Sequence, residues 1–238
     1  MNTSMERRRF TGEFYTPIRF VELAHKYAAK HWGNLDQYSF YDPASGTGNL
    51  IFPLTKYDKV FMSTLEPDDI NYINSSNVFP GATAWQEDFL NTLKVKADLA
   101  MALKDKSRKW IFIMNPPFAA GTDMSSLAGV GKEKTGVATN DIRDIMATKT
   151  LGHAIQDTQS QFLYKLVHMI NHYDLDVRIV QFGSVKLLNS PGYHSFREMI
   201  NKHITCVDGF MFPSWTFDGT AGKWPVLCSM WERVPVCK

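Results

Sequence analysis

Asn115-Pro116-Pro117 and the Phe118 that follows are the residues of this sequence best suited to chemistry. They come directly after the apolar run 110–114, which has the length and composition of a buried strand. Two prolines restrict the backbone, so the Asn115 amide and the Phe118 ring are held in set positions. The Asn115 side chain and the Pro116 carbonyl could grip a planar amine whose ring stacks on Phe118. Asn-Pro-Pro is also an ordinary turn sequence, but here it stands where a strand pattern stops.

A second group of small and polar residues, 42–50, reads Asp-Pro-Ala-Ser-Gly-Thr-Gly-Asn-Leu. Gly46 and Gly48 permit a tight turn and the close approach of a ligand to the backbone. The segment is not a dinucleotide fingerprint, because Ile51 stands where a third glycine is required, and no lysine follows to make a phosphate loop. With Asp42 just ahead of it, the turn suits a ligand that carries an amino group and a ribose. A strand-to-helix turn without a ligand is the alternative.

Two more acidic residues stand at the ends of expected strands. Glu66 is placed to accept hydrogen bonds from both hydroxyls of a ribose. Asp88 could accept from an adenine amine, with the Phe89 ring covering the base. Each signal is weak by itself, and the agreement in position among the motifs carries more weight.

The apolar pattern predicts the elements that position these motifs. Thr16 and Pro17 look like the N-cap and first residue of a helix. Expected strands cover 39–42, 60–65, part of 83–90, 110–114 and 177–182, with a closing antiparallel pair at 206–212 and 226–231. Expected helices cover 16–31, 49–56, a stretch from 68, 92–105, 156–173 and 195–203. This alternation indicates an α/β fold with a doubly wound, mostly parallel seven-stranded sheet, whose ligands bind beyond the carboxyl ends of the strands.

The stretch 119–155 breaks this alternation. It is rich in glycine, serine and threonine and shows little apolar periodicity, so we expect a long functional or mobile loop there. With this loop included, we expect residues 1–238 to form one domain, without a separate target-recognition domain.

Composition limits the function classes. The chain has 238 residues, 44% of them hydrophobic, which is enough for one large core. A net charge of +2 does not by itself indicate nucleic-acid binding. We expect a cytoplasmic protein without a membrane segment, because no apolar run approaches the roughly 18 residues that span a bilayer and no signal core follows the N-terminus. No metal site is predicted, since His168 and His172 lack a third ligand nearby. The three cysteines also lack metal spacing, and they suit a reducing compartment: Cys206, Cys228 and Cys237.

Taken together, 42–50 and 115–118 resemble the paired motifs of S-adenosylmethionine-dependent amino-methyltransferases. The segment 11–17, Thr-Gly-Glu-Phe-Tyr-Thr-Pro, resembles the one before the cofactor motif in N6-adenine DNA methyltransferases of the gamma arrangement. That group includes modification subunits of type I restriction systems and fused restriction–modification enzymes. The resemblance covers about residues 9–118, and it implies a Rossmann-like methyltransferase fold, S-adenosylmethionine as cofactor and adenine in DNA as substrate.

The resemblance also implies roles for individual residues. Segments expected to pack over or line the cofactor contain Phe14, Tyr15, Thr16, Pro17, Asp42, Pro43, Ala44, Gly46, Gly48 and Asn49. Glu66 would hold the ribose, and Asp88 with Phe89 the adenine. Asn115 and Pro116 would hold the target amine, Pro117 would stiffen the turn, and Phe118, which replaces the commoner tyrosine, would stack on the flipped base. Phe217 or Trp215 is a candidate second aromatic beside that base.

Other interpretations remain open. RNA bases and protein glutamine amides present a similar planar amine, although glutamine methyltransferases usually place a helical domain before the cofactor motif and only 41 residues precede Asp42. The chain could also be a catalytically incomplete or partner-dependent subunit. Family members usually carry a target-recognition domain after the catalytic one, so we expect a partner chain or a missing domain to supply DNA sequence recognition.

Overall fold

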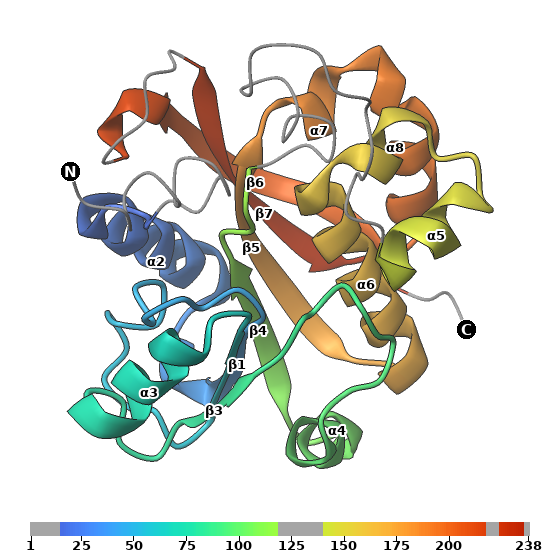
Figure 1. Cartoon of the computed structure of the whole chain (residues 1–238). Helices are drawn as coiled ribbons and strands as arrows, with labels where there is room; N and C mark the ends of the chain where they lie inside the picture. The colour runs from blue at the N-terminus through green and yellow to red at the C-terminus, as the bar shows by residue number, and fades with distance from the viewer. Residues whose placement is uncertain (1–14, 119–139, 218–223, 236–238) are drawn as a thin grey trace, which may run out of the picture.

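A seven-stranded sheet forms the centre of the computed structural model, which describes residues 15–118, 140–217 and 224–235 (Figure 1). The strand order is β3-β2-β1-β4-β5-β7-β6. The first five strands in the chain pair in parallel, and β7 is antiparallel to both of its neighbours. The strands are β1 (Tyr38–Asp42), β2 (Val60–Thr64), β3 (Thr83–Gln86), β4 (Lys109–Met114), β5 (Asp176–Ser184), β6 (Ile204–Pro213) and β7 (Pro225–Arg233). The predicted sheet and its closing antiparallel pair are confirmed.

Helices cover both faces of this sheet (Figure 1). Helices α2 and α3 pack on one face, and α4, α5, α6 and α8 pack on the other. The α-helices are α2 (Ile18–Trp32), α3 (Pro67–Ser76), α4 (Ala97–Lys104), α5 (Asp141–Ala147), α6 (Thr158–Tyr173), α7 (Lys186–Asn189) and α8 (His194–Ile200). Short 3-10 turns are η1 (Leu35–Gln37), η3 (Gly152–Gln156), η4 (Pro191–Tyr193) and η5 (Ser214–Thr216).

Strand β4 shows why the sheet is central. Trp110, Phe112 and Met114 pack into the core cluster on the α6 face, whereas Ile111 and Ile113 pack into the cluster on the α2 face. A strand that is apolar on both sides must be covered on both sides, which is the requirement of a doubly wound sheet.

The predicted helix over 49–56 is wrong. The chain forms successive tight turns there, with the Ile51 amide donating to the Gly48 carbonyl at 3.0 Å and the Leu54 amide donating to the Ile51 carbonyl at 3.0 Å. Pro53 has no amide to donate and clashes with a helical turn before it, so the apolar spacing is not realised as a helix.

The start of α2 also differs from the prediction. Pro17 occupies the N-cap position and no side chain caps the helix, so Thr16 lies outside the helix instead of capping it. Thr16 is 2% exposed, which leaves its hydroxyl facing the protein interior.

The predicted long loop is wrong over its second part. Helix α5 and turn η3 occupy much of 140–156, and the Asn140 side chain caps α5 by accepting from the Arg143 amide at 2.8 Å. Ile142 and Met146 lie four residues apart on α5, and both are completely buried. This short amphipathic pattern follows a glycine-rich stretch, and the prediction extended the loop over it. Residues 119–139 lie outside the described residues.

Candidate functional site

The carboxyl ends of β3, β2, β1 and β4 bring four predicted site residues to one edge of the sheet. Asp42 ends β1, Glu66 and Asp88 follow β2 and β3, and Asn115 follows β4. Strands β1 and β4 are hydrogen-bonded neighbours, with Tyr41 paired to Phe112. The order of strands reverses between them, so the glycine turn and the double-proline turn flank the switch point, where open α/β sheets bind ligands.

Asp42 is the most unusual group at this edge. It is completely buried, and its Oδ1 accepts a hydrogen bond from the Ala44 amide at 3.0 Å. Its Oδ2 is buried and has no hydrogen-bond partner among the described residues. Burial raises the pKa of this carboxyl to about 8, against the smaller opposing effect of the Ala44 bond. A cation bound beside Asp42 would favour the ionised carboxylate, and Oδ2 could then accept a hydrogen bond from that ligand.

The turn after Asp42 requires glycine at two positions. Gly46 has φ +51° and Gly48 has φ +93°, both in the left-handed region. A Cβ added at Gly46 would lie 3.1 Å from the Tyr15 ring, and one at Gly48 would lie 2.5 Å from the Phe79 ring. The Tyr15 and Phe79 rings therefore pack directly against the backbone of this turn and leave no room for a side chain at either glycine.

The segment before α2 lies against this turn. The Asn49 side chain donates to the Thr16 carbonyl at 3.4 Å, and the Tyr15 hydroxyl donates to Asp69 in the first turn of α3 at 3.5 Å. The Thr16 hydroxyl is a second buried oxygen without a hydrogen-bond partner among the described residues. Predicted cofactor residues from two separate segments thus meet, while Phe14 lies outside the described residues.

The acidic residues at the next two strands differ in environment. Glu66 is half-buried at the start of α3. Asp88 is exposed, and its carboxylate accepts from the Leu90 amide at 3.2 Å and from the Asn91 side chain. Phe89 is 3% exposed, and its ring lies 4.8 Å from the Phe162 ring in the core. These core contacts already surround the Phe89 ring, and its role at an adenine stays a prediction.

An aromatic cluster surrounds the double-proline turn. Phe118 is half-buried, and its ring centroid lies 4.8 Å from that of Trp224 and 5.8 Å from that of Phe217. Phe217 is 1% exposed and Trp215 is 60% exposed, so of the two late aromatics named from the sequence only Phe217 contacts this turn. Trp224 was not predicted from the sequence, because its only signal there is its position just before the last expected strand.

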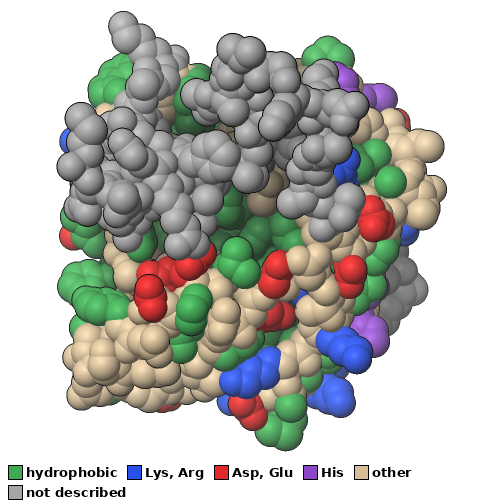
Figure 2. Space-filling model, viewed as in Figure 1, with side chains coloured by type: hydrophobic (Ala, Val, Ile, Leu, Met, Phe, Trp, Pro, Cys, Tyr) green, Lys and Arg blue, Asp and Glu red, His purple; other side chains and the backbone are tan. Residues whose placement is uncertain are grey.

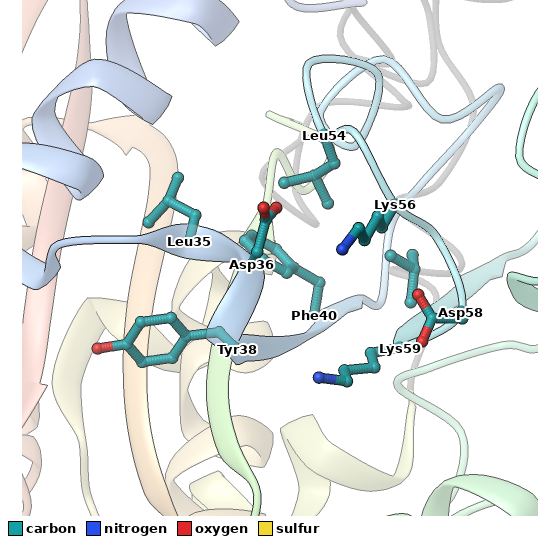
Figure 3. A pocket seen from close by; sticks show the side chains of 9 residues that line it. Leu35, Asp36, Tyr38, Phe40, Leu54, Lys56, Asp58 and Lys59 are labelled. Atoms are coloured by element: carbon teal, nitrogen blue, oxygen red, sulfur yellow. The ribbon is translucent and has the colours of Figure 1, made fainter.

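The cavity in Figure 3 lies elsewhere. It has a volume of about 120 Å³ and is lined by residues that include Tyr38 and Val60, the first residues of β1 and β2. It is therefore at the amino ends of these strands, opposite Asp42, and it is smaller than the 300–1,000 Å³ typical of ligand pockets.

Neither a metal site nor a membrane-spanning helix is seen in the parts of the chain that the structure describes. No three His, Cys, Asp or Glu side chains cluster in a way that could bind a metal ion over 15–118, 140–217 and 224–235. Within the same ranges, no helix combines the length and the apolar character needed to cross a bilayer.

Solved structures share this architecture. A modification subunit of a putative type I restriction enzyme from Vibrio vulnificus has a TM-score of 0.58 and 17% identity, over 93% of this chain and 45% of that one. The complex of DrdV with DNA has a TM-score of 0.60 and 18% identity, over 97% and 27%. Magnesium protoporphyrin IX methyltransferase from Synechocystis, with bound S-adenosylmethionine, has a TM-score of 0.52 and 12% identity, over 98% and 92%.

This chain has the Rossmann-like methyltransferase fold. It spans less than half of the first two of these proteins. At such low identity the likeness concerns the fold alone. The sequence matches no model of a known family and none of the curated proteins with which it was compared.

Proposed function

We propose that this chain transfers a methyl group from S-adenosylmethionine to the N6 amine of adenine in DNA. One observation carries the proposal: the buried Asp42, whose Oδ2 has no hydrogen-bond partner among the described residues, lies beside a glycine turn at the sheet edge where Asn115 also lies. One motif is suited to an amino-acid nucleoside and the other to a planar amine, and neighbouring strands carry them.

The residues present fit such a cofactor. Asp42 Oδ2 would accept a hydrogen bond from the cofactor's ammonium group, and a positive charge there would favour the ionised carboxylate that burial disfavours. Glu66 would hold the ribose and Asp88 the adenine amine. Bound there, the cofactor supplies an electrophilic methyl group. The turn and the segment over it would line its methionine and ribose side through Tyr15, Thr16, Pro17, Pro43, Ala44, Gly46, Gly48 and Asn49.

Asn115 would make the adenine amine a better nucleophile by accepting one of its hydrogens. The lone pair of an adenine amine is delocalised into its ring, which makes the amine a poor nucleophile. The Asn115 side chain and the Pro116 carbonyl would accept its two hydrogens and favour a pyramidal nitrogen. Pro117 would keep the turn stiff while Phe118 stacks on the extruded base. This positioning would lower the barrier by several kcal/mol, without a covalent nucleophile.

DNA is the proposed substrate because the double-proline turn with its aromatic ring suits a flipped base, and because one solved structure with this fold is described as a DNA complex. Figure 2 shows acidic side chains across the middle of one face and basic ones mainly at its lower edge and sides. With a net charge of +2, the chain would have modest affinity for DNA by itself. We therefore propose that a partner chain or a further domain contributes target recognition. We also propose that the protein acts in the cytoplasm.

Mass spectrometry of nucleosides tests this function. Purified protein is incubated with S-adenosylmethionine and either DNA or RNA, and the nucleosides are then analysed. We expect N6-methyladenine from DNA, formed at a rate that falls by roughly 100-fold or more when Asn115→Ala protein is used. Methylcytosine, or methylated nucleosides from RNA alone, would contradict the proposed substrate. No product from protein that binds the cofactor, with a partner chain supplied, would contradict the activity.

A further inference from the structure

Lys165 is a charged side chain inside the core. It lies on α6, on the sheet face that also carries α4 and α5, and its side chain is 1% exposed. Lysine is almost never fully buried unless it has partners, so its surroundings need an explanation.

The partners of Lys165 lie on both sides of Asp88. Its Nζ donates a hydrogen bond to the Phe89 carbonyl at 2.6 Å, lies 3.7 Å from Glu87 Oε1, and sits 3.9 Å from the centroid of the Phe89 ring. Glu87 is fixed in turn, because its Oε2 accepts from the Trp85 indole at 2.8 Å. Burial lowers the pKa of Lys165 to about 8, an effect partly offset by the neighbouring Glu87 carboxylate.

The short segment 87–91 therefore rests on the helices packed beneath it. Besides the Lys165 contacts, the Leu90 carbonyl accepts from the Ile142 amide of α5 at 3.1 Å. Within the segment, the Asp88 carboxylate accepts from the Leu90 amide. Glu87, Phe89 and Leu90 are anchored to other elements, and Asp88 is the exposed acidic side chain between these anchors.

Net stability is a weak explanation for this arrangement. A buried ion pair contributes little net stability, because desolvation of the charges offsets their attraction, and apolar replacements are often neutral or stabilising. Lys165 instead fixes the backbone around Asp88, because its Nζ binds the Glu87 carboxylate before this exposed aspartate and the Phe89 carbonyl after it. We propose that Lys165 is a positioning residue that holds Asp88 in place for the adenine of the cofactor, an inference that rests on the proposed function.

The test uses a variant that removes both buried charges. Lys165→Met alone would leave Glu87 without its cation, so it is combined with Glu87→Gln, which can still accept from Trp85. Lys104→Met, on the exposed end of α4, is the matched control. Hydrogen exchange of the Leu90 and Asn91 amides measures the order of the segment without any cofactor. Calorimetry with S-adenosylmethionine, and with its analogue that lacks the purine amine, measures recognition of the adenine.

We expect exchange at Leu90 and Asn91 to be at least tenfold faster in the double variant, with Phe112 in β4 unchanged. Affinity for S-adenosylmethionine should fall about tenfold, and affinity for the amine-free analogue should fall less. Adding Asp88→Asn should then have little further effect, because the two changes act through one contact. The kcat at saturating cofactor should stay within about twofold.

Other results overturn the inference. Unchanged exchange at Leu90 and Asn91 would show that Lys165 does not order the segment. Equal losses of affinity for both ligands would show that it does not act through the adenine amine. Failure of the wild-type protein to bind S-adenosylmethionine would instead contradict the proposed function, and the exchange data would still decide whether Lys165 positions Asp88.

Discussion

The glycine turn at 42–49 and the double-proline turn at 115–118 leave neighbouring strands but are built in opposite ways. The glycine turn takes its shape from left-handed backbone conformations and keeps the buried Asp42 Oδ2 without a partner among the described residues. The double-proline turn takes its shape from the backbone angles that the two proline rings fix, and its Phe118 ring packs against Trp224 and Phe217. One turn presents a buried carboxyl and glycine backbone, while the other presents an amide and an aromatic ring.

This difference suits the two turns to two different ligands at one edge of the sheet. A polar, charged cofactor needs buried acceptors and close approach to the backbone, whereas a flipped base needs a rigid aromatic face and an acceptor for its amine. If the two turns serve two ligands, a change in one should spare binding at the other. Substitutions in the two turns should therefore have separate effects, of which the loss of Asn115 is the largest.

Asn115→Ala should lower the rate of methyl transfer by roughly 100-fold or more, because it removes an acceptor that acts on the amine as the bond forms. Affinity for S-adenosylmethionine should stay within a few-fold of wild type by calorimetry. Asn189→Ala, an exposed residue at the end of α7, serves as the control and should be unaffected. Transfer at the wild-type rate by Asn115→Ala would remove Asn115 from the mechanism.

Gly48→Ala should destabilise the fold by about 3 kcal/mol, because it combines a left-handed backbone with a Cβ placed 2.5 Å from the Phe79 ring. Gly33→Ala is the control, since Gly33 has φ +76° and ψ −141° but nothing within 4 Å of an added Cβ, and backbone strain alone should cost about 2 kcal/mol there. Urea denaturation measures both. Equal effects at the two positions would contradict the close packing of the Phe79 ring against Gly48.

Asp42 should make stability depend on pH. Its pKa is raised to about 8 in the folded protein, so the folded state holds a proton that the unfolded chain loses above its ordinary pKa of about 4. The free energy of unfolding should therefore fall as pH rises from about 5 to 8, by at most about 1.4 kcal/mol per pH unit. Urea midpoints of Asp42→Asn should fall less steeply over this range, and identical slopes would contradict the assignment.

Trp224→Ala should weaken the base side of the site only slightly. Loss of one aromatic contact to Phe118 is worth about 1 kcal/mol, which corresponds to roughly a fivefold rise in KM for DNA with little change in cofactor affinity. Trp215→Ala, which alters an exposed ring, is the control. A larger effect of Trp215→Ala than of Trp224→Ala would show that the aromatic cluster has been misidentified.

Sequence reasoning predicted the sheet well because apolar runs such as 110–114 are buried on both faces, which makes their pattern unambiguous. It failed at 49–56, where an apolar pattern outweighed the effect of Pro53, and at α5, where a glycine-rich approach hid a two-turn helix. Both errors concern short segments, in which tertiary packing decides the conformation.

The candidate site was predictable only in part. Asp42, Gly46 and Asn115 stand at strand ends, so topology alone brings their segments to one edge. The contact of Trp224 with Phe118 joins remote parts of the chain and has no local signal. Lys165 was equally hidden, because its burial depends on acceptors that a distant turn supplies.

Calorimetric titration of S-adenosylmethionine into wild-type and Asp42→Asn protein tests the central claim most directly. At pH 6.5, in two buffers of different ionisation enthalpy, wild-type protein should bind and release a proton, because contact with the cofactor's ammonium ionises Asp42. Asp42→Asn should bind at least tenfold more weakly and release none, while Asp36→Asn at the opposite edge should behave as wild type. Absence of binding to the wild type, or undiminished binding by Asp42→Asn, would contradict the account.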